Sequence, residues 1–305
     1  QRNTRKMGRY APWPRQHLVQ RLPRMARRAV SRAGAVEILR PVLRVFAVNR
    51  SIQELMSIIS AKNLSLTFQT NDGPVHALKG VDLTIEKGEF VSFIGPSGCG
   101  KTTFLRCIAA LETPTGGTLT VNGMTPDQAR RARAYGYVFQ AAGLYPWRTI
   151  EKNIALPLEI MGFDKAEQKA RVDRVLDLVD LNGFDKKFPW QLSGGMQQRV
   201  ALARCLANDP DVILMDEPLG ALDALTREKM QSLVLKLWKE TGKTIVLITH
   251  SVEEALLLGE RLLVMAPRPG RIHREYRLPF ADLGVDQDLR EVKKHPEYAE
   301  KREEI

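Results

Sequence analysis

A glycine-rich run at residues 95–102, GPSGCGKT, has the composition and spacing of a loop that binds phosphate groups. Its glycines allow backbone angles in which successive N–H groups point into one concavity, and a helix beginning near Lys101 would direct its positive end there. Lys101 can then reach the outer phosphates of a nucleotide, and the Thr102 hydroxyl can bind Mg²⁺. The predicted nucleotide-binding residues of this loop are Gly95, Pro96, Ser97, Gly98, Cys99, Gly100, Lys101, Thr102 and Thr103.

Two adjacent carboxylates end an apolar run at residues 211–218, DVILMDEP. Such a run suits a central strand of a parallel sheet, and functional groups gather where the strands of these sheets end. Asp216 is the predicted Mg²⁺ ligand, and Glu217 is predicted to polarise the attacking water. An isolated Asp-Glu pair would more often be a solvated strand end or a helix cap, but the apolar run and the upstream loop favour the catalytic interpretation.

A third motif, LSGGMQQR at residues 192–199, provides a second surface for an anion. Ser193, Gly194 and Gly195 precede a predicted helix over residues 197–207, so they can present N–H groups and a hydroxyl at a helix N-terminus. One chain cannot easily bring this surface to its own phosphate loop.

These motifs, in this order, resemble the nucleotide-binding subunits of ABC transporters, and the resemblance extends over residues 57–276. It implies an α/β fold, the P-loop NTPase fold of ABC ATPases, with an antiparallel β subdomain and an inserted α-helical subdomain. It also implies ATP and Mg²⁺ as cofactors and ATP hydrolysis as the reaction. Because the third motif of this family closes on the ATP of a facing subunit, the resemblance implies a homodimer that sandwiches two nucleotides.

Four further residues stand where the family assigns roles. Phe68 matches an aromatic residue that stacks on adenine, and Gln140 matches a glutamine that senses Mg²⁺ and relays to the membrane subunit. Asp223 matches the loop that crosses to the partner, and His250 matches a histidine held against the γ-phosphate. Taken singly, each has an ordinary structural interpretation, and only their order and spacing favour these roles. The predicted catalytic residues are Lys101, Gln140, Glu217 and His250, and the predicted metal ligands are Thr102, Gln140 and Asp216.

The segment LYPWRTI at residues 144–150 is similar to importer subunits of the nitrate, sulfonate and taurine class, as are residues 288–305. Only about 35 residues follow Gly270, too few for the regulatory domain of sugar-type importers. The class implies transmembrane permease subunits and an extracytoplasmic solute-binding protein as partners, and no nucleic acid. It also implies a location at the cytoplasmic face of the inner membrane, where the chain is held by the permease.

Two other functions would use the same chemistry. One is a soluble ABC-type ATPase that acts on nucleic acid or ribosomes, although the sequence has neither the long coiled coil nor the second cassette of such proteins. The other is an exporter or lipid-extraction ATPase, against which the Pro146-Trp147 pair weighs only modestly.

The pattern of apolar residues predicts the elements that position these groups. Residues 62–85 alternate around a turn at residues 71–74, which indicates the antiparallel subdomain. From Phe90 onward strands alternate with helices, as in a parallel α/β core, and helical stretches between residues 145 and 205 carry the third motif. The predicted nucleotide-binding domain is residues 56–276. Residues 277–305 are predicted to be a polar helical tail with one helix near residues 286–304.

Composition agrees with this interpretation. The 305 residues are 44% hydrophobic, enough for a substantial core, and three cysteines are too few for a disulfide framework, which favours a reducing cytosol. No run reaches the roughly 18 apolar residues of a membrane span, so a transport channel would have to be another polypeptide.

The net charge of +11 lies in one segment. Residues 1–55 hold twelve arginines and one lysine against Glu37 and Glu54, while the remaining residues are balanced. Three interpretations of this basic arm are open: a tail that binds anionic lipid or nucleic acid, a processed targeting peptide, or upstream sequence wrongly joined to a chain that starts at Met56. We favour the third, with the arm disordered or outside the natural protein.

Overall fold

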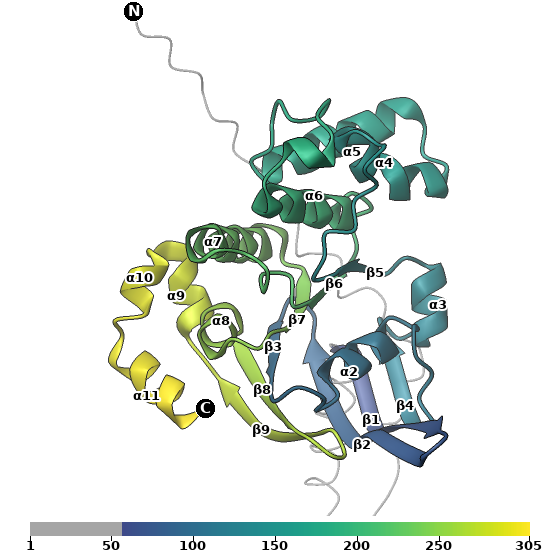
Figure 1. Cartoon of the computed structure of the whole chain (residues 1–305), viewed down its shortest axis with the longest axis vertical. Coiled ribbons are helices and arrows are strands. Elements are labelled where there is room, and N and C mark those ends of the chain that lie inside the picture. The colour runs from purple at the N-terminus through teal and green to yellow at the C-terminus, as the bar shows by residue number, and fades with distance from the viewer. Residues whose placement is uncertain (1–56) are drawn as a thin grey trace, which may run out of the picture. The chain divides into compact units, whose positions relative to one another are not determined.

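The computed structural model describes residues 57–305. The predictions for the basic arm and for a start at Met56 therefore lie outside the described residues. Two sheets and a separate group of helices make up the described part, and Figure 1 shows the helices α4, α5 and α6 together above the sheets.

The first sheet is antiparallel, with strand order β2-β1-β4. Its strands are β1 (Ser57–Thr70), β2 (Gly73–Glu86) and β4 (Gly116–Val121). The predicted turn joins β1 to β2, and Gly73 takes a φ of 107°, which residues with a side chain rarely adopt. In the second half of β2 buried and exposed residues alternate, so one face packs on the core and the other faces solvent.

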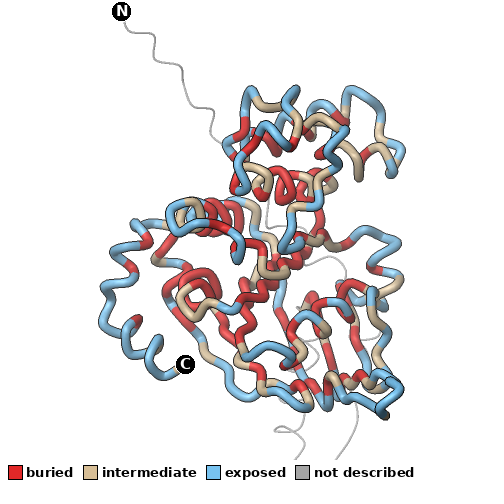
Figure 2. The backbone as a smooth tube through the Cα atoms, viewed as in Figure 1, coloured by how far each residue is buried: buried red, intermediate tan, exposed pale blue. Residues whose placement is uncertain are grey.

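The second sheet has the order β5-β6-β7-β3-β8-β9 and is parallel except for its last strand. Two of its strands, β3 (Phe90–Ile94) and β7 (Thr244–Ile248), are buried at every residue. Figure 2 shows the same concentration of buried residues in this sheet. The other strands are β5 (Tyr135–Val138), β6 (Val212–Asp216), β8 (Arg261–Ala266) and β9 (Arg271–Arg277).

The strand order decides where the functional groups meet. Strands β6, β7 and β3 are neighbours and run in the same direction, so their carboxyl ends lie side by side. The phosphate loop follows β3. Asp216 is the last residue of β6 and Glu217 is the first residue after it, while His250 lies two residues after the end of β7. Three motifs that are far apart in the sequence therefore reach one edge of the sheet.

Four helices accompany the sheets. They are α2 (Lys101–Ile108), α3 (Pro126–Arg131), α7 (Ala224–Thr241) and α8 (Val252–Leu258). Helix α2 buries Phe104 and Leu105, which belong to the core that also includes the antiparallel sheet. Helices α7 and α8 join a second core together with the helical group.

The helical group consists of α4 (Ile150–Met161), α5 (Lys165–Leu178), the short 3₁₀ helix η3 (Pro189–Gln191) and α6 (Gly194–Leu206). Apolar side chains of α4, α5 and α6 pack on one another, among them Ile154, Val175 and Val200. The predicted α/β fold with an antiparallel β subdomain and an inserted helical subdomain is thus confirmed.

The C-terminal region differs from the single helix predicted near residues 286–304. It forms three short helices, α9 (Phe280–Asp286), α10 (Leu289–Val292) and α11 (Pro296–Glu304). Gln287 and His295 are extended and separate them, and His295 is extended because it precedes a proline. The region is also less polar than predicted, since Phe280, Leu289 and Tyr298 are buried.

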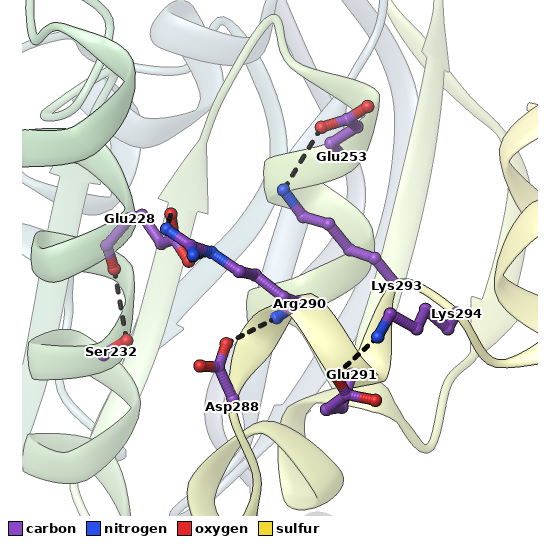
Figure 3. Close-up of polar contacts among 8 residues, drawn as sticks. All are labelled: Glu228, Ser232, Glu253, Asp288, Arg290, Glu291, Lys293 and Lys294. Carbon is purple, nitrogen blue, oxygen red and sulfur yellow. Dashed lines mark hydrogen bonds and ion pairs between the residues drawn. The ribbon is translucent and has the colours of Figure 1, made fainter.

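Ion pairs attach these helices to α7 and α8, as Figure 3 shows. Arg290 lies 2.9 Å from Glu228 of α7, and Lys293 lies 3.5 Å from Glu253 of α8. Exposed pairs of this kind contribute little stability, so the buried side chains named above hold the region in place.

Within residues 57–305, no helix is long and apolar enough to cross a membrane.

Candidate functional site

The phosphate loop is an open turn between β3 and α2 that depends on its glycines. Gly95, Gly98 and Gly100 have φ values of 154°, 76° and 94°. A Cβ atom at Gly100 would lie 2.8 Å from Leu78 Cδ2 and 2.9 Å from the Ala77 carbonyl oxygen, closer than packed atoms tolerate. Helix α2 starts directly after Gly100, so its first N–H groups face the concavity of the loop.

Lys101 lies against the loop it belongs to. Its Nζ donates to the carbonyl oxygens of Gly95 at 2.7 Å and Pro96 at 3.3 Å, and the side chain is buried. The ammonium group is therefore already held at the place where a nucleotide phosphate would enter the concavity. Cys99, beside it, is buried and free.

Thr102 and Asp216, both predicted as metal ligands, are brought together. The Thr102 hydroxyl donates to Asp216 Oδ1 at 3.0 Å, across 114 positions of sequence. A third residue, to which the sequence assigned no role, completes the group: the Tyr137 hydroxyl donates to Asp216 Oδ2 at 3.0 Å. This contact depends on the pairing of β5 with β6, which no signal in the sequence indicated.

Glu217 and His250 also meet. Glu217 Oε1 lies 2.5 Å from His250 Nε2, and both side chains remain partly exposed. The backbone of Glu217 takes a φ of 50°, and its N–H donates to the Ile248 carbonyl oxygen at 3.0 Å. This left-handed conformation at a non-glycine residue is costly, and such residues gather at functional sites.

A buried acid supports the loop that carries His250. The Thr249 hydroxyl donates to Glu254 Oε2 in a short hydrogen bond, and the Ser251 N–H donates to the Thr249 hydroxyl at 3.0 Å. Glu254 is 3% exposed, and burial raises the pKa of its carboxyl above the usual value. Sequence reasoning did not identify this acid, because nothing in a helical Glu-Glu pair indicates which member is buried.

Gln140 is exposed and begins a loop after β5 that helix α6 holds. The side chain of Gln198 donates to the Phe139 carbonyl oxygen at 3.0 Å. Further along the helix, Arg204 donates to the carbonyl oxygens of Ala142 and Gly143 at 2.8 and 2.9 Å. The loop with Gln140 is therefore attached to the helix that begins with the third motif.

Phe68, near the end of β1, is 38% exposed. A single phenylalanine on a strand is more often part of the hydrophobic core, but Phe68 is not. An exposed ring near the end of a strand is available for stacking.

The third motif begins helix α6. Ser193 is its N-cap and accepts a hydrogen bond from the Met196 N–H at 3.3 Å. Gly194 faces open space, whereas a Cβ atom at Gly195 would collide with Thr226 Cγ2. Asp223 caps α7 by accepting from the Thr226 N–H at 3.0 Å, so the starts of α6 and α7 pack together. Within the described residues, no hydrogen bond joins residues 193–195 to the phosphate loop.

Comparisons with known proteins agree with this geometry. A family model described as ABC transporter matches residues 78–220. Over 253 residues the chain is 63% identical to the taurine import ATP-binding protein TauB of Roseobacter denitrificans, covering 82% of this chain and 93% of the relative. It is 61% identical over 251 residues to the protein of that name from a Jannaschia species, with coverage of 82% and 93%.

A solved structure shares the fold. The ATP-binding cassette MJ0796, in a dimeric post-hydrolysis state bound to ADP and Pi, aligns with a TM-score of 0.63 at 39% identity, covering 72% of this chain and 98% of that one. The chain therefore belongs to the ABC transporter family. Within it, the chain is an ATP-hydrolysing, ATP-binding subunit, and the predicted importer class of nitrate, sulfonate and taurine type is confirmed.

Proposed function

We propose that this chain powers the import of taurine or a closely related small sulfonate by hydrolysing ATP. Relatives that are 63% and 61% identical along most of their own length carry the name taurine import ATP-binding protein. The observation that carries the catalytic part is the pairing of Glu217 with His250 beside the Thr102–Asp216 contact. A candidate general base, the histidine that contacts it and a phosphate-binding loop thus lie together where the strands of one sheet end.

Each predicted site residue receives a role in this proposal. The loop residues 95–103 bind the phosphates, Lys101 neutralises their charge, and Phe68 stacks on the adenine ring. Glu217 accepts the proton of the attacking water or orients that water, and His250 holds Glu217 and reaches the γ-phosphate. Gln140, in the loop bound to α6, senses Mg²⁺ and relays to the membrane subunit.

Mg²⁺ fits the oxygen atoms gathered at the end of β6. Thr102 and Asp216 supply hard oxygen donors 3.0 Å apart, and Gln140 could add an amide oxygen. The described residues contain no group of three or more acidic, histidine or cysteine ligands. That agrees with an ion that proteins hold by one or two carboxylates while phosphates and waters complete its shell. Bound there, the ion would neutralise charge on the transferred phosphoryl group.

The third motif suggests a second copy of the chain as a partner. Ser193, Gly194 and Gly195 form a helix start with open space beside Gly194. Within residues 57–305, no hydrogen bond joins them to their own phosphate loop. A two-fold dimer would place this start on the nucleotide of the partner subunit, with Asp223 at the crossing. Dimeric structures of the related cassette MJ0796 support this arrangement.

A groove of about 490 Å³ between β5, α4 and α6 suits the permease. Its lining includes the apolar side chains of Phe139 and Ile160, which are 49% and 68% exposed, and the cations Arg133 and Arg204. Among the described residues none that lines it is acidic, so it suits an apolar segment that carries acidic side chains. Docking of a permease there would hold the chain at the cytoplasmic face of the membrane, with an extracytoplasmic binding protein supplying the solute.

The test combines chemistry and uptake. The purified chain should hydrolyse ATP in the presence of Mg²⁺, and Lys101→Ala should lose most of its nucleotide affinity. In cells, deletion of the gene should abolish uptake of radiolabelled taurine, and the wild-type gene should restore it while the Lys101→Ala gene does not. Normal taurine uptake after deletion would reject the proposed substrate. A purified chain that does not hydrolyse ATP would reject the catalytic assignment.

A further inference from the structure

Asp216 is held by hydrogen bonds at both of its oxygen atoms. Thr102 donates to Oδ1 and Tyr137 donates to Oδ2, each at 3.0 Å. The first donor belongs to the phosphate loop motif, whereas the second comes from β5, at the edge of the sheet. A carboxylate bonded at one oxygen can still rotate about its last side-chain bond, but one bonded at both oxygens is fixed in plane and direction.

The Tyr137 side chain supplies the proton of this hydrogen bond. A phenol is protonated in the physiological pH range, whereas a carboxylate can only accept, so the O–H of Tyr137 donates to Asp216. Its ring packs on Phe139, with ring centroids 4.3 Å apart and planes inclined by 32°. The ring that carries the hydroxyl is thus packed against a second aromatic ring.

Tyr137 also lines the groove described above, together with Phe139. One residue therefore both borders the groove and bonds to Asp216. Tyr137 begins the segment that ends at Gln140, but the sequence assigned it no role, and its role follows from the contact between β5 and β6.

We propose that Tyr137 is a positioning residue that orients Asp216 for Mg²⁺. The proposal rests on the proposed function, because it takes Asp216 as the metal carboxylate. Without the hydroxyl, Oδ2 loses its donor and the carboxylate can turn away from the direction that a metal ion requires. Hydrogen bonds to ligating groups of this kind are worth roughly 10- to 100-fold in metal affinity where they have been removed.

Tyr137→Phe tests the proposal, with Tyr135→Phe as a matched control. Tyr135 lies two residues earlier on the same strand, is also half-buried, and donates its hydroxyl to the Ala109 carbonyl oxygen. Binding of ADP to the purified chain is measured by titration calorimetry, first without Mg²⁺ and then at increasing Mg²⁺ concentration. Steady-state ATP hydrolysis is measured over the same Mg²⁺ range.

We expect Tyr137→Phe to bind metal-free ADP as the wild type does and to need roughly tenfold more Mg²⁺ for half-maximal enhancement of ADP binding and for hydrolysis. Saturating Mg²⁺ should restore most of the turnover. In an Asp216→Asn background the same substitution should add no further shift, because Tyr137 acts through that carboxylate. Tyr135→Phe should leave the Mg²⁺ dependence unchanged.

An unchanged Mg²⁺ dependence in Tyr137→Phe, or an equal shift in Tyr135→Phe, would overturn the positioning role. These results differ from a failure of the proposed function, in which the wild type itself would show no Mg²⁺-dependent binding or hydrolysis.

Discussion

The phosphate loop and the start of helix α6 are both proposed to bind an anion, yet they differ in what surrounds them. Around the loop, Lys101 bonds to loop carbonyls, Thr102 bonds to Asp216, and strand ends deliver further groups. At the start of α6, Ser193 only caps its own helix and Gly194 faces open space. The first surface is assembled by one chain, while the second has structural support but no hydrogen bond to the phosphate loop within residues 57–305. In the proposed function, this difference means that catalysis needs two chains although nucleotide binding needs one.

Glu217→Gln should have the largest effect, and it changes the site around the phosphate loop. Because the amide cannot accept the proton of the attacking water, we expect hydrolysis to fall by roughly 10²- to 10⁴-fold while ATP still binds. Phosphate release and ATP titration measure the two quantities. Glu253→Gln, which changes an acid at the start of α8 outside the site, should keep its turnover. Undiminished turnover in Glu217→Gln would remove this residue from the reaction.

Gly195→Ala should disturb the second surface, the start of helix α6. The new methyl group would meet Thr226 Cγ2, so the start of α6 must move away from α7, at a cost of about 1–3 kcal/mol of unfolding free energy. Thermal unfolding measures the loss, and Thr226→Ser should recover part of it in the double variant by removing that carbon. Gly194→Ala is the sharper comparison, because its methyl group would have no neighbour within 4 Å among residues 57–305. We expect it to unfold like the wild type and to lose ATP-dependent dimerisation, and a dimer that forms normally would contradict the open surface proposed here.

Ser193→Ala should have a smaller effect. Loss of the side-chain cap of α6 should lower the free energy of unfolding by about 1 kcal/mol. Thr149 caps α4 in the same helical group, so Thr149→Ala should cost a similar amount. Only Ser193→Ala should also weaken the ATP-dependent dimer in sedimentation experiments. Equal dimer stability in both variants would assign Ser193 to capping alone.

Glu254→Gln should have the smallest effect, and it would show as a change of stability with pH. Because burial raises the pKa of this carboxyl in the folded state, the folded protein loses stability as the pH rises from the unfolded pKa through the folded one. Glutamine cannot ionise and keeps the acceptor for Thr249. The melting temperature of the variant should therefore match the wild type near pH 4 and exceed it near pH 8. A difference that stays constant with pH would show that Glu254 does not titrate in this way.

The sequence predicted the parts of the site that follow from local pattern. A glycine loop after an apolar strand and two carboxylates at a strand end are local features, and the parallel sheet then places them together. The contact of Tyr137 with Asp216 depends on which strand lies beside β6, and the contact of Gly195 with Thr226 depends on how α6 packs on α7. Neither can be derived from spacing along the chain.

The C-terminal region shows the opposite case, because its helix break has a local signal. A residue that precedes a proline is biased away from the helical conformation, so the sequence indicated a break before Pro296 within residues 286–304. The buried Phe280 and Leu289 could not be foreseen in the same way, because their burial depends on packing against α7 and α8.

The bonds from Gln198 and Arg204 to the loop of residues 139–143 have a consequence for protein engineering. They make helix α6 and that loop a single exchangeable module, although about fifty residues separate the two in the sequence. A hybrid subunit that takes α6 from another transporter but keeps its own loop would leave three carbonyl groups without their donors. Swapping both segments together preserves the match, and it offers a route to subunits that accept a foreign permease.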